Sequence, residues 1–158
     1  MKITVIGCGR WGSFITWYLD SIGHQVFLYG RETSAHMQRF LKERKNNLLT
    51  LPESVGLTTD LTAVSASEVI IISINSQGLQ KLMEELKTFN LKNKKIVLCM
   101  KGIEIETGRR LSQIAEENLD SSNSVLYGLD RDMFRNLQRV YRTVWSLTVW
   151  MSRRNQNS

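Results

Sequence analysis

The sequence predicts an α/β fold in which a doubly wound, mostly parallel sheet carries helices on both faces. Short apolar runs rich in Ile and Val alternate along the chain with amphipathic stretches of helical period. These apolar runs are nearly continuous, as is typical of strands that are buried on both faces. No internal repeat and no low-complexity linker interrupts the alternation. Together these observations favour parallel strands joined by helical crossovers.

The chain opens with a strand, a turn and a helix. Residues 2–7 are apolar and partly β-branched, which predicts a buried strand. A helix is predicted over residues 10–22, and Gly23 is suited to end it as a C-cap. The spacing of its apolar residues predicts that one face of this helix consists of Phe14, Ile15, Tyr18 and Leu19.

The strand–helix alternation continues through the middle of the chain. Residues 25–29 predict a second strand, and residues 34–45 predict an amphipathic helix. Residues 53–59 are expected to form a loop or a short strand, after which Asp60 caps a short helix.

The run "SEVIIISI" at residues 67–74 is the most strand-like part of the sequence. It is followed by a predicted helix at residues 76–86, a strand at 94–100, a helix at 107–117 and a last strand at 124–127.

The composition is typical of a soluble globular protein. The 158 residues suffice for one domain with a real core, and 42% are hydrophobic and 23% charged. No apolar run approaches the ~20 residues of a membrane span, and Met1 and Lys2 lead into a strand without a signal-peptide cleavage site. We therefore expect a cytoplasmic protein. Cys8 and Cys99 are too few for a disulfide scaffold and are expected to be small core residues at strand ends.

The positive charge is concentrated at the carboxyl end of the chain. From residue 129 onward there are six Arg and two Asp but no Lys or Glu, a net charge of +4, whereas the whole chain carries +6. The first 128 residues therefore carry only +2. This excess in one terminal segment says little about the main domain, and no motif that reads nucleic-acid bases accompanies it. We expect neither a nucleic-acid partner nor a metal site.

The spacing Gly7-x-Gly9-x-x-Gly12 falls between the first predicted strand and the first helix. A dinucleotide-binding fingerprint lies at this place, where Gly7 permits the tight turn, Gly9 lets the backbone approach a pyrophosphate, and Gly12 lets the helix pack close to the sheet. The helix N-terminus adds free N–H groups and a positive dipole end. The sequence therefore predicts a Rossmann-like cofactor domain, and the alternative is a glycine turn that binds nothing.

The end of the second strand bears on the choice of cofactor. An acid there usually holds the ribose 2′-hydroxyl of NAD, but Arg31 stands near that position. A guanidinium suits a 2′-phosphate, which favours NADP(H). Because Glu32 is suited to hold the ribose of NAD, and because a solvated Arg31 is also a reasonable interpretation, both cofactors stay open.

Five segments together resemble one family. They are "GCGRWG" at residues 7–12, "LYGRE" at 28–32, "LTTDL" at 57–61, "IISINSQ" at 71–77 and "MKGIEIETGRRLSQI" at 100–114. Their order and spacing resemble those of the bacterial NAD(P)-dependent glycerol-3-phosphate dehydrogenases. The tryptophan in the glycine turn and the Lys-Gly-Ile-Glu segment make the resemblance specific. It covers residues 1 to about 126, which would be the family's cofactor domain.

The resemblance implies the reduction of dihydroxyacetone phosphate to sn-glycerol 3-phosphate, a step in phospholipid synthesis. It implies that Arg10 and Trp11 line the cofactor phosphates and that Arg31 meets the adenosine end. Lys101 would face both the nicotinamide and the substrate, beyond the carboxyl end of a strand, where a cation stabilises developing negative charge. The resemblance also allows a homodimer, for which nothing in these residues argues.

Three residues depart from the family pattern. Arg10 stands where a small residue is usual, Asn75 where proline is common, and Met100 where a hydroxyl residue precedes the lysine. The first two departures bear on cofactor affinity, and the third removes one polar contact beside the substrate.

The resemblance ends before the chain does. The family continues into a second, all-helical domain, which holds the acid/base lysine, whereas no lysine follows Lys101 here. We therefore expect that domain to be absent, residues 127–158 to form a poorly packed basic tail with exposed Trp145 and Trp150, and the catalytic acid to be unidentifiable in this chain.

A shifted reading frame would explain the tail. With suitable synonymous codons, the bases encoding residues 128–133 also encode Ser-Gly-Pro-Gly-His two bases later, which resembles the loop that the family has at this point. The nucleotide sequence tests this hypothesis, because an uninterrupted family-like frame without these bases would exclude it. The alternative is a natural amphipathic tail, since Leu137, Val140, Tyr141 and Val144 have helical spacing.

The residues and the family resemblance leave two functions open. The first is the cofactor half of a glycerol-3-phosphate dehydrogenase that is inactive alone. The second is a non-catalytic NAD(P)-binding module or redox sensor, which the missing acid/base lysine favours for the isolated chain.

Overall fold

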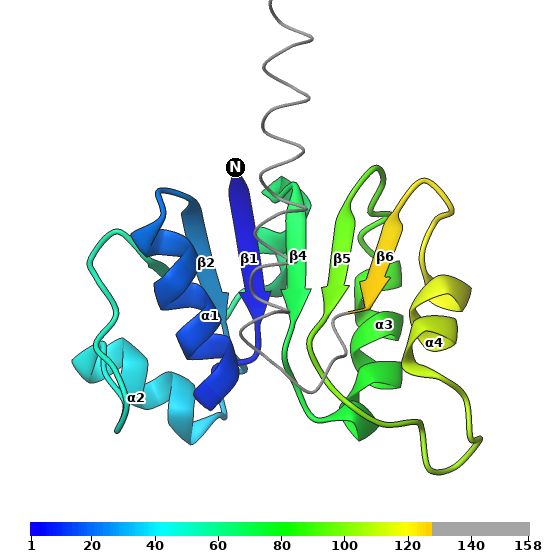
Figure 1. Ribbon diagram of the computed structural model, residues 1–158, viewed down its shortest axis with the longest axis horizontal. Coiled ribbons are helices and arrows are strands. Elements are labelled where there is room, and N and C mark those ends of the chain that lie inside the picture. Colours follow the sequence, from blue (N-terminus) through cyan, green and yellow to red (C-terminus); the bar gives the residue numbers. More distant parts are fainter. Residues whose placement is uncertain (128–158) are drawn as a thin grey trace, which may run out of the picture. The chain divides into compact units, whose positions relative to one another are not determined.

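The structure is a computed structural model, and it describes residues 1–127 (Figure 1). The predictions for the tail, including its packing, its exposed tryptophans and its helical spacing, lie outside the described residues.

Strands and helices alternate along the described part. The strands are β1 (Lys2–Ile6), β2 (Gln25–Tyr29), β3 (Gly56–Thr58), β4 (Val69–Ile72), β5 (Lys95–Leu98) and β6 (Ser124–Tyr127). The helices are α1 (Arg10–Ser21), α2 (Ala35–Glu43), α3 (Leu79–Lys87) and α4 (Leu111–Asn118), with 3₁₀ helices η1 (Leu61–Ala66) and η2 (Ser76–Gly78).

The six strands form one sheet in the order β3-β2-β1-β4-β5-β6. Every pair of neighbouring strands is parallel, so the predicted doubly wound α/β fold is confirmed. Val5 in β1 lies opposite Leu28 in β2 and Ile71 in β4. Because β1 is central, all of its residues from Ile3 onward are buried, which explains the continuous apolar run.

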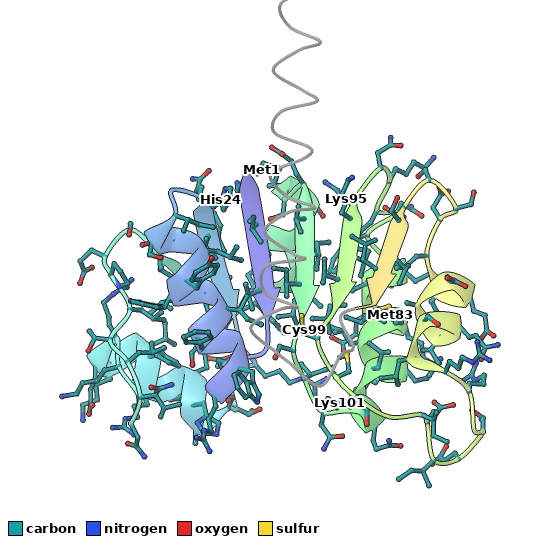
Figure 2. The ribbon with its side chains drawn as sticks, in the orientation of Figure 1. Met1, His24, Met83, Lys95, Cys99 and Lys101 are labelled. Atoms are coloured by element: carbon teal, nitrogen blue, oxygen red, sulfur yellow. The ribbon has the colours of Figure 1, made fainter. Side chains whose placement is uncertain are left out.

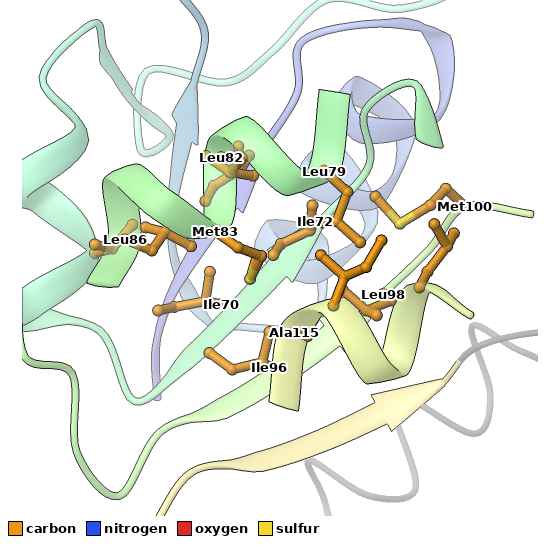
Figure 3. Packing of buried hydrophobic residues seen from close by; sticks show 14 of the residues in the cluster. Ile70, Ile72, Leu79, Leu82, Met83, Leu86, Ile96, Leu98, Met100 and Ala115 are labelled. Carbon is orange, nitrogen blue, oxygen red and sulfur yellow. The ribbon is translucent and has the colours of Figure 1, made fainter. Parts of the chain in front are cut away.

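One face of the sheet packs against α3 and α4. Figure 3 shows side chains of α3 lying against alternate residues of β4 and β5. The buried cluster on this face includes Ile70, Ile72, Leu79, Leu82, Met83, Leu86, Ile96, Leu98 and Ile114. Since successive strand residues point to opposite faces, the intervening residues face the side that α1 covers.

The α1 helix ends as predicted but buries a different face. Gly23 has φ +93° and donates to the carbonyl of Asp20, while the His24 N–H donates to that of Leu19, which closes the helix end. The predicted face was partly wrong, since Phe14 and Tyr18 are only half-buried. The buried face instead consists of Gly12, Ser13, Ile15, Thr16 and Leu19.

Several predicted boundaries shift. The predicted helix at 76–86 is divided into η2 and α3, and the strand at 67–74 is confined to Val69–Ile72. The fourth helix begins at Leu111 rather than at residue 107. Residues 107–110 instead belong to a loop, in which Gly108 has φ +69° and the side chains of Thr107 and Arg109 bind Glu104.

Candidate functional site

The candidate site lies at the edge of the sheet where the parallel strands end. Figure 2 shows Cys99 and Lys101 at this carboxyl edge, while Met1, His24 and Lys95 lie at the opposite edge. The connections leave β1 and β4 in opposite directions along the sheet, because β2 lies on one side of β1 and β5 on the far side of β4. Such a switch point opens a crevice in which doubly wound folds bind ligands.

Two of the three glycines in the turn after β1 are required by the protein's own packing. Gly7 has φ +113°, and a Cβ there would overlap the backbone carbonyl of Ser73. A Cβ on Gly12 would overlap the carbonyl oxygen of Gly7. Both obstacles are backbone atoms, which cannot turn aside as a flexible side chain does. These two glycines therefore hold β1, α1 and the segment after β4 in close contact.

Gly9 differs from the other two glycines. It has φ −71° and ψ −172°, which any residue adopts, and a Cβ there would find nothing within 4 Å. The fold therefore does not require a glycine at this position. The open space lies where the dinucleotide fingerprint places a pyrophosphate against the backbone. A ligand that approaches closely would explain why no side chain stands there.

The N-terminus of α1 faces this space without a side-chain cap. Gly9 is the N-cap and offers no side chain, so within residues 1–127 the first N–H groups of the helix keep no capping partner. Arg10 and Trp11 in this first turn are exposed, Trp11 by 51%. Oriented N–H groups at the positive end of a helix dipole favour an anion such as a phosphate.

Arg31 lies at the end of β2, close to where the sequence places it. Gly30 precedes it and donates to the carbonyl of Thr58, which continues the pairing with β3. The Arg31 side chain is half-exposed, and its Nη2 lies 3.7 Å from the Glu85 Oε1 of α3. This ion pair could not be predicted from the sequence, because its partners belong to different crossover units.

Lys101 is exposed and follows β5 at the carboxyl edge, as expected. Its backbone is fixed on both sides. The preceding residue, Met100, is buried in the core cluster, and the following residue, Gly102, has φ +112°.

Gln77 also belongs to this region, although it was not predicted as a site residue from the sequence. Its Nε2 donates to the carbonyl of Ile103 and its Oε1 accepts from the N–H of Ile105, each at 3.0 Å. The side chain thus pairs with the loop as a neighbouring strand would, two residues beyond Lys101. The position of Gln77 in the matching segment "IISINSQ" was the one signal that pointed to it.

A polar network holds the rest of this loop. Arg109 Nη2 lies 3.0 Å from Glu104 Oε2 and 3.1 Å from Gln80 Oε1, and Arg109 Nη1 lies 2.5 Å from Glu117 Oε2. Hydrogen bonds from Thr107 and Arg109 lower the pKa of Glu104 below its usual range. The loop that carries Lys101 is therefore anchored to η2, α3 and α4.

Asn75 and the cysteines complete this edge. Asn75 Oδ1 accepts from the Gln77 N–H at 2.9 Å, so the asparagine caps η2 in the place where the family resemblance leads us to expect proline. Cys8 is buried, and its Sγ lies 3.4 Å from the Ser34 Oγ. Burial raises the pKa of the Cys99 thiol to about 11.

Among residues 1–127, no three or more His, Cys, Asp or Glu side chains are grouped so that they could hold a metal ion. No helix in this described part is long and apolar enough to cross a membrane.

The sheet order, the parallel strands and the glycine turn at the switch point define a Rossmann-type domain. Residues 2–129 match the family model described as the N-terminus of NAD-dependent glycerol-3-phosphate dehydrogenase. The chain belongs to this family.

Similar proteins agree with this assignment. The chain is 35% identical over 132 residues to a glycerol-3-phosphate dehydrogenase (NAD(P)+) of a Thermoanaerobacter species, a match covering 81% of this chain and 40% of that protein. A relative of the same name from Yersinia pestis is 34% identical over 123 residues, covering 75% of this chain and 36% of that protein. The chain thus spans about 40% of the length of the curated relatives it matches.

Solved structures share the fold. The glycerol-3-phosphate dehydrogenase of Coxiella burnetii superimposes with a TM-score of 0.67 at 17% identity, over 84% of this chain and 54% of that one. The enzyme from Saccharomyces cerevisiae gives a TM-score of 0.68 at 22% identity, over 87% of this chain and 44% of that one.

Proposed function

We propose that this chain binds NAD(H) or NADP(H) at the carboxyl edge of its sheet and supplies the cofactor half of a glycerol-3-phosphate dehydrogenase. The whole reaction is the reduction of dihydroxyacetone phosphate to sn-glycerol 3-phosphate. The observation that carries the proposal is the open space at Gly9, which the fold itself does not need. In this proposal the cofactor domain ends near residue 126.

Each residue at the edge has a role in the proposal. Gly7 and Gly12 shape the turn, Gly9 leaves room for the pyrophosphate, and the backbone N–H groups of Arg10 and Trp11 receive it. The nicotinamide cofactor supplies the hydride. Lys101 contacts the nicotinamide end of the cofactor and the substrate, where its charge stabilises the negative charge that develops on the carbonyl oxygen.

A second candidate is a non-catalytic NAD(P)-binding module or redox sensor. The observation that favours it is that residues 102–158 contain no lysine, so none of them replaces the acid/base lysine that the family resemblance places in a second domain. A general acid is typically worth about 10²–10⁴ in rate, and positioning between domains is worth more.

We expect the 158-residue chain to bind NADPH or NADH weakly and to show no oxidation of either that depends on dihydroxyacetone phosphate. Because the chain spans only about 40% of the length of its relatives, we expect water to reach the nicotinamide and Lys101 to act at a high dielectric constant, where its charge stabilises little. Fluorescence titration measures the binding. The fall in the absorbance of the reduced nicotinamide measures the turnover. Absence of binding would contradict the proposal, and robust turnover would contradict the expected inactivity.

Arg31→Ala is expected to weaken NADPH binding by about fivefold or more and to leave NADH binding within about twofold. The 2′-phosphate of NADPH carries the charge that a guanidinium pairs with, whereas the ribose hydroxyl of NADH is neutral. Calorimetric titration of both nucleotides checks this expectation. Equal weakening of both would refute the assignment of Arg31 to the 2′-phosphate.

A further inference from the structure

The Arg31 guanidinium already has an anionic partner in the folded chain. Its Nη2 lies 3.7 Å from the Glu85 Oε1, and both side chains are about half-exposed. Arg31 follows β2, whereas Glu85 lies on α3, which joins β4 to β5. The ion pair therefore joins the end of β2 to the helix between β4 and β5. Arg31 lies at the carboxyl edge of the sheet, where we propose that the cofactor binds.

A second carboxylate lies in the same neighbourhood. Asp60 caps η1 through a hydrogen bond from the Thr62 N–H to its Oδ1 at 2.9 Å. The pKa of the Tyr29 hydroxyl is raised by burial and by the charge of Glu85, whereas the charge of Arg31 lowers it and that of Asp60 raises it. All three charges thus act on one side chain at the end of β2.

The ion pair between Arg31 and Glu85 meets the two forms of the cofactor differently. A 2′-phosphate brings close to two negative charges, and it must displace Glu85 from Arg31 or share the guanidinium with it. A 2′-hydroxyl brings no charge and leaves the ion pair intact. An exposed pair of this kind contributes little by itself, so the effect on binding is a matter of a few-fold and is screened by salt.

We propose that Glu85 competes with the 2′-phosphate of NADP(H) for Arg31 and so lowers the affinity for NADP(H) relative to NAD(H). This inference rests on the proposed function and names a specificity-determining residue outside the glycine turn. In this proposal the ratio of the affinities for NADP(H) and NAD(H) depends on Glu85 as well as on Arg31. The presence of Arg31 by itself therefore does not predict which cofactor binds more tightly.

The test is Glu85→Gln in the full 158-residue chain, with Glu84→Gln as the matched control. Glu84 is the adjacent residue on α3, and its Oε1 accepts a hydrogen bond from the Gln80 Nε2 at 2.7 Å rather than pairing with Arg31. We expect Glu85→Gln to tighten NADPH binding about two- to fivefold and to leave NADH within about 1.5-fold. Glu84→Gln should change neither, and the gain should shrink in about 0.5 M salt.

The same substitution in an Arg31→Ala chain separates competition from simple repulsion. If Glu85 acts by occupying Arg31, the gain in NADPH affinity is smaller in this background than in the native chain. Three results would overturn the inference: an equal gain in NADPH affinity in both backgrounds, an equal gain for NADH, or no gain with Glu85→Gln. None of them would contradict the proposed function as long as the native chain binds nucleotide. A native chain that binds neither nucleotide would instead refute the proposed function, and the inference with it.

Discussion

Replacing Gly12 by alanine is expected to lower the melting temperature of this protein by roughly 10 °C. The new methyl group would overlap the carbonyl oxygen of Gly7, so α1 has to move away from the sheet. Overpacking typically costs about 1–3 kcal/mol, and a backbone obstacle places this substitution at the upper end. Such a loss is a large share of the ~5–15 kcal/mol that keeps a domain folded. Thermal unfolding followed by circular dichroism measures it.

Gly9→Ala is the matched control for this experiment. The same methyl group there meets nothing within 4 Å and requires no unusual φ, so the melting temperature should stay within about 3 °C of the native value. If the Gly12→Ala and Gly9→Ala chains had the same melting temperature, the close approach of α1 to the turn would not be a source of stability.

Substitutions at Gly9 are expected to weaken nucleotide binding while the protein stays folded. An alanine side chain would occupy the space proposed for the pyrophosphate and weaken NADH and NADPH binding about tenfold, and valine would weaken both about hundredfold. Both nucleotides should lose affinity equally, because they share the pyrophosphate. Fluorescence titration gives the affinities, and the melting temperature shows that the fold is intact.

The prediction would be contradicted if the Gly9→Val chain bound NADH and NADPH as tightly as the native chain does. This result would place the nucleotide elsewhere and remove the observation on which the proposed function rests. A loss confined to NADPH would likewise argue against the pyrophosphate assignment, since it would indicate contact with the 2′-phosphate instead.

The sheet was predictable because β1, β4 and β5 are buried on both faces and therefore are apolar at nearly every position. The glycine turn was predictable for a related reason, since local spacing alone specifies it. The buried face of α1 was not. Periodicity favoured Phe14 and Tyr18, but the contact between Gly12 and the turn rotates small residues such as Ser13 and Thr16 toward the sheet.

Contacts between distant segments account for what the sequence did not reveal. The late start of α4 depends on Thr107 and Arg109 binding Glu104 rather than continuing a helix. The pairing of Gln77 with the loop after Lys101, and of Arg31 with Glu85, joins separate crossover units. Hydrophobic periodicity carries no information about such polar pairs.

The reactivity of the two cysteines can be used to measure local opening at this edge of the sheet. Cys8 follows β1 and Cys99 follows β5, and they are the chain's complete set of thiols. Cys99 is only partly buried, but its raised pKa of about 11 leaves little thiolate at pH 7, so its alkylation is slow. Cys8 is buried, so its reaction with a maleimide reports how often the segments around it separate. A nucleotide that holds these segments together slows that reaction in proportion to its occupancy.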